Sequence, residues 1–558
     1  MRYRRSILAP VAVLGIAVVT GGWFLQQGVK QEENVYFQAR LFQEVVDRIA
    51  SDFVDPVPKD SLYQSAIEGL ITEIADPNSS LMAASDYEDL RIRTQGDYGG
   101  VGLEITEREG FVTVVSPIPG TPGARSGIRP GDQFVEIDGK PAAGWNSNQA
   151  VEVLRGPAGS DVLVKVRRLG VDQPIPFTLR RERIHLKSVP FAISLGQGIA
   201  YVPLQVVRET SSAELRAALD SLKAAAGSLK GIVLDLRGNP GGLLEQGIAV
   251  SDLFVAKGAG IVETRGRAPN QSETFNASQG DHYPNVPVVA LVDEYSASAA
   301  EIISGALQDY DRALVVGMPS YGKGSVQTLF RLSGGNVLRL TTARWYTPVG
   351  RSIDKPHDQQ IAARETGART LNGTYTQVPM LAGRPTTKSK GGRTLYGGGG
   401  ITPDVIVLAD TLTSDEQTAL RALEPQAGAF QTALFNFAVR LIQERSSLQP
   451  DFTISDQDLD RVYDSLDDAI KAEVSRDVYR KAARFIRYDL ERKVALQKWG
   501  EGAEFRRSIA HDTQLRAALD LIGRADSPAA LFRAAEQASP RTPASAATAD
   551  SAARAGDL

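Results

Sequence analysis

The feature that most constrains the fold of this chain is a pair of apolar β-strands separated by an amphipathic helix. Segments 198–204 (GIAYVPL) and 231–237 (GIVLDLR) are short and rich in β-branched residues, which is typical of strands buried on both faces. Residues 213–226 between them have helical periodicity. A strand, a helix and a strand in this order form a crossover between parallel strands. Residues 183–410 are therefore predicted to form an α/β core with a mostly parallel sheet.

The segments on either side of this core have other patterns. Residues 96–182 contain short β-rich runs separated by Gly and Pro turns, which predicts an inserted β-rich domain. Residues 31–95 and 411–530 have helical periodicity and are predicted to be helical flanks. The Ala/Ser/Thr-rich residues 531–558 are predicted to be a disordered tail. A chain of 558 residues is too long for one core, so several domains are expected.

Two helices are predicted in the N-terminal flank. The first is expected to end before Pro56, and the second to run from about Ser61 to Asp76. The apolar residues of the second helix that are expected to face inward are Leu62, Ile67, Leu70 and Ile74.

The first 30 residues are typical of an export signal. Arg2, Arg4 and Arg5 precede a charge-free apolar run at residues 7–25, which as a helix would be about 28 Å long and would match the thickness of a bilayer core. This length favours an uncleaved signal anchor over a cleaved signal peptide, although both remain open. In either case the body of the protein is expected outside the cytoplasm, facing the periplasm or extracytoplasmic space.

Composition excludes several classes of chemistry. The chain has no cysteine, which removes thiolate metal sites, disulfides and a cysteine nucleophile. Its four histidines, His185, His282, His357 and His511, are far apart and lack metal-ligand spacing, so no metal site is expected. The net charge is -4 with no basic block outside the N-terminus, which argues against a nucleic-acid partner.

Two motifs in the predicted core suggest nucleophilic catalysis. Ser298 lies in YSASAAEIISGAL (295–307), where small residues lead into a helix; by itself it could be an ordinary N-cap. Lys323 lies between glycines in YGKGSVQ (321–327), and these glycines are expected to let the backbone pass close to the nucleophile. A buried, neutral lysine can act as general base for a serine. Because Gly324 follows the lysine, the phosphate-binding loop pattern is not satisfied.

A third motif, LDLRGNPGG (234–242), ends a predicted buried strand in a Gly/Pro turn. Such a turn can direct backbone N–H groups into a site at the carboxyl end of a parallel sheet, although it could also be a simple tight turn. Asp235 and Arg237 at the strand end are interpreted as a structural ion pair rather than as catalytic groups.

Together these motifs resemble the carboxyl-terminal processing peptidases, also called tail-specific proteases, over about residues 37–408. The resemblance implies that Ser298 is the nucleophile, that Lys323, 25 positions later, is the general base, and that Gln327 orients the lysine. It also implies an oxyanion hole formed by the amides of Ala299 and Gly242, a ClpP/crotonase-like core, and no cofactor. The sequence departs from the family pattern in a long insertion after His357.

The β-rich segment resembles a PDZ domain. YGGVGLEI (98–105) is similar to the PDZ carboxylate-binding loop, and GTPGARSGIRPGDQFVEIDG (120–139) is similar to the rest of a PDZ core. The resemblance implies that a peptide carboxylate binds the backbone N–H groups of Gly100, Val101, Gly102 and Leu103. The side chains of Val101 and Leu103 could equally belong to the domain core.

The resemblance implies a serine endopeptidase that cleaves exported proteins near their C-termini, with the tail held by the PDZ domain. The expected partners are peptides with free C-termini, the membrane through the anchor, and no nucleic acid; a homo-oligomer or a regulatory partner is left open. Two alternatives remain at this point: a catalytically silent PDZ scaffold that binds protein tails, and an enzyme of acyl-CoA chemistry on the same core.

Overall fold

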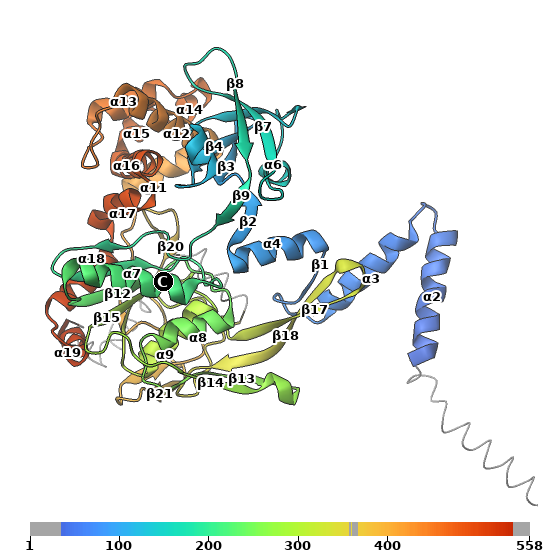
Figure 1. The fold of residues 1–558 in the computed structure, drawn as a ribbon, viewed down its shortest axis with the longest axis vertical. Helices are drawn as coiled ribbons and strands as arrows, with labels where there is room; N and C mark the ends of the chain where they lie inside the picture. The colour runs from blue at the N-terminus through green and yellow to red at the C-terminus, as the bar shows by residue number, and fades with distance from the viewer. Residues whose placement is uncertain (1–34, 357–358, 360–366, 539–558) are drawn as a thin grey trace, which may run out of the picture. The chain divides into compact units, whose positions relative to one another are not determined.

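The structure is a computed structural model that describes residues 35–356, 359 and 367–538, and these divide into two compact units (Figure 1). The first unit contains the described residues up to Ala84 together with Thr328–Thr341. The second contains Ser85–Gln327 and the described residues from Thr342 onward, and it holds every residue of the predicted catalytic site.

The first unit consists mainly of two helices and a short strand. Helix α2 spans Val35–Asp52, α3 spans Lys59–Glu73, and β1 (Ser80–Met82) pairs antiparallel with the start of β18 (Val337–Tyr346). Both helices lie close to their predicted positions.

The expectation that the apolar face of α3 is buried is wrong. Ile67, Leu70 and Ile74 are 44%, 70% and 55% exposed. Within the unit α3 packs against α2 and β1, and these short elements leave the far side of the helix uncovered.

The predicted β-rich domain consists of an antiparallel sheet with five main strands and two short helices. Its strands run in the spatial order β3-β4-β5-β7-β8, with β6 paired to β5, so β3 is an edge strand. Side chains alternate between buried and exposed along β7, and the buried ones form a core with strands β4 and β5. The elements are β3 (Leu103–Arg108), β4 (Phe111–Pro117), α5 (Pro122–Ser126), β5 (Gln133–Ile137), β6 (Lys140–Pro141), α6 (Ser147–Leu154), β7 (Asp161–Arg167) and β8 (Ile175–Arg180).

A two-stranded ribbon joins this domain to the core. Strand β2 (Asp97–Gly100) enters the domain and β9 (Glu182–His185) leaves it, and the two pair antiparallel. The β-rich domain is thus an insertion whose two ends lie side by side, after α4 (Ala84–Gln95).

The core is a six-stranded sheet in the order β10-β11-β12-β15-β16-β23. All neighbouring pairs are parallel except β10 with β11, which confirms the predicted parallel α/β core. Strands β11, β12 and β15 are buried along their whole length, as their continuous apolar runs predict. The strands are β10 (Ile193–Ser194), β11 (Ile199–Pro203), β12 (Gly231–Asp235), β15 (Val288–Val292), β16 (Leu314–Gly317) and β23 (Val405–Ile406).

Helices cover both faces of this sheet. One face packs against α7 (Ser211–Ala226), α8 (Leu244–Asp252) and α9 (Ala299–Asp309). The other packs against α18 (Thr513–Gly523) and α19 (Pro528–Ala538). The predicted disordered tail therefore starts too early, because α19 extends to Ala538 and Leu531 is fully buried. Residues 539–558 lie outside the described residues.

Smaller sheets surround the core. Strand β18 pairs with β13, and β13 pairs with β14. The insertion after His357 forms two hairpins where it is described, β19 with β20 and β21 with β22. These elements are β13 (Gly260–Gly266), β14 (Glu273–Asn276), β17 (Ser325–Arg331), β19 (Ala368–Arg369), β20 (Tyr375–Thr376), β21 (Thr386–Lys388) and β22 (Thr394–Tyr396).

The C-terminal helices have a hydrophobic core of their own, centred on buried residues such as Leu434, Val462 and Ile486. They are α11 (Ser414–Leu423), α12 (Ala427–Glu444), α13 (Asp456–Asp464), α14 (Asp468–Glu473), α15 (Arg476–Lys481), α16 (Ala483–Trp499) and α17 (Glu501–Ser508). Short 3₁₀ helices lie at Pro269–Gln271, Ser333–Gly335, Glu424–Gln426 and Ile509–His511.

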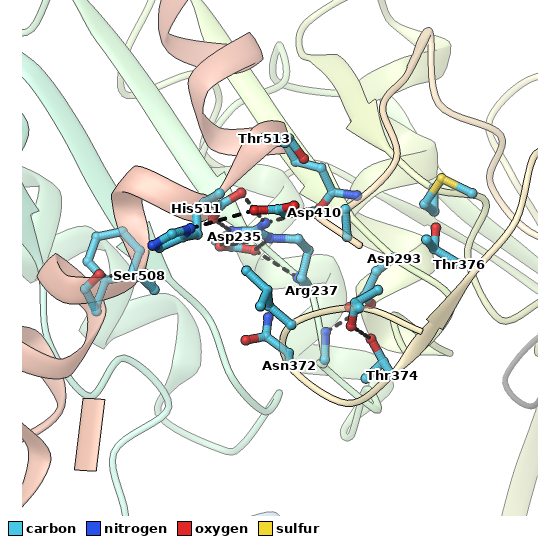
Figure 2. Close-up of a pocket in the computed structure, with 18 of the residues that line it drawn as sticks. Asp235, Arg237, Asp293, Asn372, Thr374, Thr376, Asp410, Ser508, His511 and Thr513 are labelled. Atoms are coloured by element: carbon cyan, nitrogen blue, oxygen red, sulfur yellow. Dashed lines mark hydrogen bonds and ion pairs between the residues drawn. The ribbon is translucent and has the colours of Figure 1, made fainter. Parts of the chain in front are cut away.

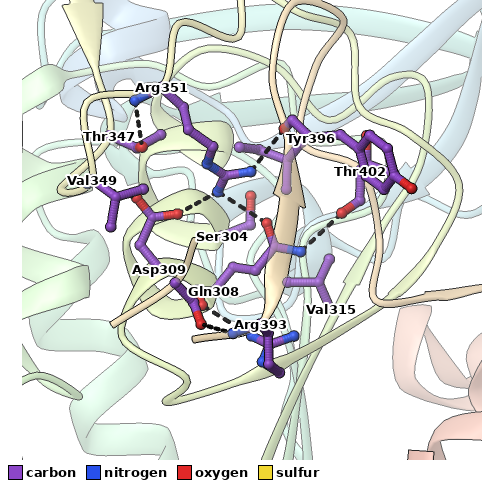
Figure 3. Close-up of polar contacts among 12 residues, drawn as sticks. Ser304, Gln308, Asp309, Val315, Thr347, Val349, Arg351, Arg393, Tyr396 and Thr402 are labelled. Atoms are coloured by element: carbon purple, nitrogen blue, oxygen red, sulfur yellow. Dashed lines mark hydrogen bonds and ion pairs between the residues drawn. The ribbon is translucent and has the colours of Figure 1, made fainter. Parts of the chain in front are cut away.

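A buried polar network fixes the C-terminal end of α9 (Figure 3). Arg351 is 5% exposed and pairs with Asp309, and it also donates to Gln308 Oε1 at 3.0 Å and Tyr396 O at 2.9 Å. Gln308 Nε2 in turn donates to Thr402 O at 2.8 Å. These contacts attach the segments after β18 to the helix whose other end carries Ser298.

Candidate active site

Ser298 lies in the turn between β15 and α9, at the carboxyl edge of the core sheet. It has φ +54° and ψ -116°, a backbone conformation that costs a non-glycine residue about 1–3 kcal/mol. The turn is held in place by Ser296, whose hydroxyl donates to Leu236 O at 2.8 Å. A strained serine between a strand and a helix is an arrangement that presents a nucleophile at a sheet edge.

Glu301 joins the two predicted catalytic segments through their main chain. One of its carboxylate oxygens, Oε2, accepts hydrogen bonds from Ser298 N at 2.7 Å and from Lys323 N at 2.9 Å. The other, Oε1, accepts from Gly322 N at 2.7 Å and from Ser320 Oγ at 2.5 Å. A single side chain therefore brings the backbones of Ser298 and Lys323 to the same place.

The Glu301 carboxyl group is buried and lies among hydrogen-bond donors. Burial raises the pKa of Glu301 above its usual value, and the four hydrogen bonds oppose this rise only in part. Ser320 Oγ accepts a hydrogen bond from Ile401 N at 2.6 Å, so its own proton is directed to Glu301. All four neighbours of the carboxylate are thus donors.

The backbone of Lys323 is fixed on a second side by Trp345. The indole Nε1 of this buried residue donates to Lys323 O at 3.0 Å, and its backbone N donates to Gly324 O at 2.9 Å. The lysine side chain is half-buried.

The two glycines beside Lys323 have a different role from the predicted one. A Cβ at Gly322 would lie 2.7 Å from Lys355 Cβ, and a Cβ at Gly324 would lie 3.0 Å from Asp354 Cβ. The glycines therefore let the lysine loop pack against the segment around Asp354, and it is Gly241 that approaches Ser298.

The turn after β12 is held by Asn239, which is fully buried. Its Nδ2 donates to Leu204 O at 2.6 Å, and its Oδ1 accepts from Gly241 N at 2.8 Å. Its backbone oxygen accepts from Ala297 N at 2.9 Å. Asn239 thus attaches the Gly/Pro turn directly to the residue before Ser298.

Gly241 makes a close approach to Ser298. A Cβ at this position would lie 2.7 Å from Ser298 Cβ and 2.8 Å from Ala299 N. Its own N–H is bound to Asn239, whereas the N–H groups of Gly242 and Ala299 donate to no acceptor within the described part of the chain. The two amides predicted for the oxyanion hole are therefore the two that remain available beside this contact.

Gln327 lies on β17, four residues after Lys323. Its side-chain amide donates to Ser325 Oγ at 2.9 Å, a contact within its own strand. The role of this residue in orienting Lys323 stays a prediction.

Asp235 and Arg237 form a structural ion pair, as predicted, within a larger buried cluster. Arg237 Nη2 lies 2.6 Å from Asp235 and 2.7 Å from Asp512 at the start of α18, and Tyr201 Oη donates to Asp235 at 2.6 Å. The cluster connects the active-site turn to the C-terminal helices.

The described histidines form pairs with other side chains away from the segments of Ser298 and Lys323. His185 lies 2.9 Å from both Asp97 and Glu214, His511 lies 3.6 Å from Asp410, and His282 lies 3.2 Å from Gln279. His357 is outside the described residues, and the residues that are described contain no cluster of three side chains suited to a metal ion.

The predicted carboxylate-binding loop directly precedes the edge strand β3. Val101 is buried in the domain core and Leu103 packs against it, so their side chains are structural. The loop is shaped by Gly102, at φ +71°, whose carbonyl accepts from Ile118 N and Thr121 Oγ1. Within the described chain the N–H groups of Val101 and Gly102 donate to no acceptor, which leaves them available to a ligand.

Glu301, Asn239 and Gly241 are the residues of the site to which the sequence motifs assigned no role. The Ser298-x-x-Glu301 spacing is a capping-box pattern, so the contact with the Ser298 amide had a local signal. The contact with the lysine loop had none, because that loop lies about 20 residues later.

The predicted anchor at residues 7–25 lies outside the described residues. Within those that are described, no helix combines the length and the apolar character that a membrane span requires.

Comparisons with known proteins find two matching family models and several similar proteins. The family model described as "Peptidase family S41" matches residues 198–361, and that of the PDZ domain matches residues 113–168. The carboxy-terminal-processing protease of Bartonella bacilliformis is 42% identical over 324 residues, covering 58% of this chain and 74% of that protein. The carboxy-terminal processing protease CtpA of Bacillus subtilis is 34% identical over 343 residues, covering 62% and 71%. The solved structure of a photosystem II D1 C-terminal processing protease is 28% identical, with a TM-score of 0.32, and covers 56% of this chain and 89% of that one.

An α/β core with a strained serine at the start of a buried helix, preceded by a PDZ domain, defines a serine-type peptidase. The chain belongs to peptidase family S41, among the carboxy-terminal processing proteases.

Proposed function

We propose that this peptidase cleaves exported proteins near their C-termini, with Ser298 as nucleophile and Lys323 as general base. The observation that carries the proposal is the Glu301 carboxylate, which binds the backbone N–H groups of both residues. One buried carboxylate thus holds the backbones of the serine and the lysine close together, which supports their assignment as nucleophile and base.

In the proposed reaction, neutral Lys323 Nζ takes the proton of Ser298 Oγ as this oxygen attacks the scissile carbonyl carbon. The tetrahedral intermediate then collapses, the C–N bond breaks, and Lys323 returns the proton to the leaving amine. Water attacks the resulting acyl-enzyme, again with Lys323 as base, and releases the carboxylate product. This sequence needs no cofactor.

The oxyanion of the intermediate is assigned to the N–H groups of Ala299 and Gly242. Both are unbound within the described chain, and both lie next to the close contact of Gly241 with Ser298. A donor of this kind contributes about 100- to 1,000-fold to kcat in other peptidases. Gln327 is assigned the role of orienting the lysine.

Tail recognition is assigned to the PDZ domain. A peptide would add to the free edge of β3, beside α6, and its terminal carboxylate would bind the N–H groups of the loop at Gly100, Val101, Gly102 and Leu103. The proposed location is outside the cytoplasm, with the N-terminal segment as signal anchor in the inner membrane; the arginines before the apolar run support this orientation.

The dyad is tested by turnover of an unfolded protein substrate. Ser298→Ala and Lys323→Ala are each expected to reduce kcat by at least about 1,000-fold, with unchanged unfolding transitions. The wild-type rate should rise with pH, because only the neutral amine can accept the serine proton. Wild-type rates in either variant, or a rate that is highest in acid, would contradict the assignment.

Tail recognition is tested with two peptides of one sequence, one ending in a free carboxylate and the other in an amide. The Ser298→Ala protein should bind the first more tightly, by about tenfold or more. Equal affinities would show that the loop does not recognise a terminal carboxylate. This result would not contradict the assignment of Ser298 and Lys323.

A further inference from the structure

A cavity of about 300 Å³ lies at the carboxyl end of the core sheet, beneath the C-terminal helices (Figure 2). Its floor is formed by residues that follow β12 and β15, among them Arg237, Gly238 and Asp293. Its roof comes from the hairpin at residues 370–376 and from the C-terminal segment 488–514. A volume of this size is at the lower end of the range for small-ligand sites.

The roof distinguishes this cavity from the proposed peptidase site. The S41 match ends at residue 361 and the PDZ match at residue 168, so neither includes the hairpin or the C-terminal segment. Figure 2 shows His511 and Ser508 of this segment on one side of the cavity and Asn372, Thr374 and Thr376 of the hairpin on the other.

Carboxylates outnumber cations in the lining. Five carboxylates line the cavity, against the guanidinium groups of Arg237 and Arg492. Arg237 is shared between two of the carboxylates, Asp410 pairs with Arg484 outside the lining at 3.0 Å, and Arg492 donates to Asn372 Oδ1 and to Glu504. The five are Asp235, Asp293, Glu294, Asp410 and Asp512. The lining therefore favours a ligand of positive charge.

Aromatic rings form another part of the lining. Tyr201 and Phe505 stack with ring centroids 4.0 Å apart, and Tyr488 and His511 meet edge to face at 5.1 Å. Aromatic faces combined with carboxylates are the chemistry by which proteins bind alkylammonium and guanidinium groups.

One buried polar group in the lining has no protein partner. Thr376 is 4% exposed, and its Oγ1 makes no hydrogen bond within the described residues. A buried hydroxyl without a partner is costly, and a ligand N–H that donates to it would satisfy it.

We propose that this cavity binds an alkylammonium or alkylguanidinium group. The group could be the side chain of a lysine or arginine in the substrate, or it could belong to a free small amine such as arginine. Both sources offer the same chemistry: a cationic head for the carboxylates, N–H donors for Thr376, and an aliphatic stem for the rings.

A ligand in the cavity would lie next to the two turns that carry the proposed catalytic groups. Asp293 accepts hydrogen bonds from Gly238 N at 2.9 Å and from Ser296 N at 3.0 Å, so it connects the turn after β12 to the turn that carries Ser298. A cation beside Asp293 therefore binds at the base of both turns.

The experiment compares arginine with citrulline, which has nearly the same shape but no charge, by calorimetric titration of the full chain carrying Ser298→Ala. Arginine is expected to bind at least about tenfold more tightly. Glu294→Gln and Thr376→Val should each weaken arginine binding several-fold. Asp451→Asn, which removes an exposed carboxylate outside the cavity, should leave it unchanged.

A second arm uses active protein and two peptide substrates that carry arginine or citrulline at one position. If free arginine raises the KM of the arginine peptide alone, the ligand is a substrate side chain; if free arginine binds without changing either KM, the ligand is a free amine. The proposal is wrong if citrulline binds with the same affinity as arginine and the two peptides respond alike. It is also wrong if Glu294→Gln and Thr376→Val bind arginine with the affinity of the parent protein.

Discussion

At the scale of single residues, the positions of Ser298 and Lys323 are set mainly by contacts with their main-chain atoms. Glu301 touches Ser298 and Lys323 through their backbone N–H groups, and Asn239 attaches the glycine turn to Ala297 in the same way. The proposed nucleophile and base are thus held through their main chain by groups that take no part in the proposed reaction.

Glu301→Gln tests this positioning role. The amide keeps the shape of the carboxylate, but its nitrogen cannot accept the two hydrogen bonds that one carboxylate oxygen receives. We expect a loss of about 1–3 kcal/mol in the free energy of unfolding and a fall in kcat of about 10- to 100-fold, measured by urea unfolding and peptide turnover. Glu209→Gln, at an exposed position, is the control. A Glu301→Gln enzyme with wild-type kcat would contradict the role.

Gly241→Ala tests the close approach to Ser298, the proposed nucleophile. The added methyl group would lie within 2.8 Å of Ser298 Cβ and Ala299 N, so we expect kcat to fall by about 100-fold or more. Gly258→Ala is a matched control, because Gly258 has a similar φ of +83° but no atom within 4 Å of an added Cβ. Equal effects of the two substitutions on kcat would show that backbone strain, and not the contact, is responsible.

At the scale of elements, one histidine contacts both the ribbon that leads into the PDZ domain and a helix of the core. His185 on β9 binds Asp97 on β2 and Glu214 on α7, and Arg183 also pairs with Asp97 at 2.5 Å. Burial lowers the pKa of His185, but its contacts with Glu214 and Asp97 raise it by more, so the net pKa lies above the usual value of 6.5. The ribbon is therefore attached most firmly when this imidazole carries its proton.

This attachment predicts a pH dependence with a definite sign. Because the folded protein binds the His185 proton more tightly than the unfolded chain, the contribution is fully present below pH 6.5 and is lost as pH rises through the higher folded pKa. Urea unfolding of wild type and His185→Gln across this range should show a stability difference that is largest in acid and shrinks with rising pH. A difference that grew with pH would contradict the pairing.

At the scale of the whole molecule, the C-terminal helices complete the peptidase core. Helices α18 and α19 cover one face of the central sheet, and Leu515, Leu521 and Leu531 are buried there against β12, β15 and β16. The peptidase fold thus depends on residues more than 200 positions after Ser298.

Leu521→Ala tests this dependence. Removing a side chain that is 2% exposed should lower the free energy of unfolding by about 2–5 kcal/mol, with loss of activity at the temperature where the core unfolds. Arg516→Ala, exposed on the same helix, should change stability little. The measurement is urea unfolding followed together with peptide turnover; activity that survives unfolding of α18 would show that the core is independent of it.

The sequence by itself determined the features that depend on local pattern. Continuous apolar runs predicted the buried parallel strands, and alternation with glycine turns predicted the inserted β-rich domain. The Ser298 and Lys323 motifs predicted both segments of the candidate site. Each motif consists of small and turn-forming residues at neighbouring positions, so it can be recognised without knowing the fold.

Only the tertiary structure decided which distant groups meet. The contact of Glu301 with the lysine loop, the approach of Gly241 rather than Gly322 to Ser298, the exposed face of α3, and the covering of the sheet by α18 and α19 all depend on chain segments brought together by folding. Helical periodicity predicts that one face of a helix is apolar. Whether another element buries that face depends on how distant segments of the chain pack together.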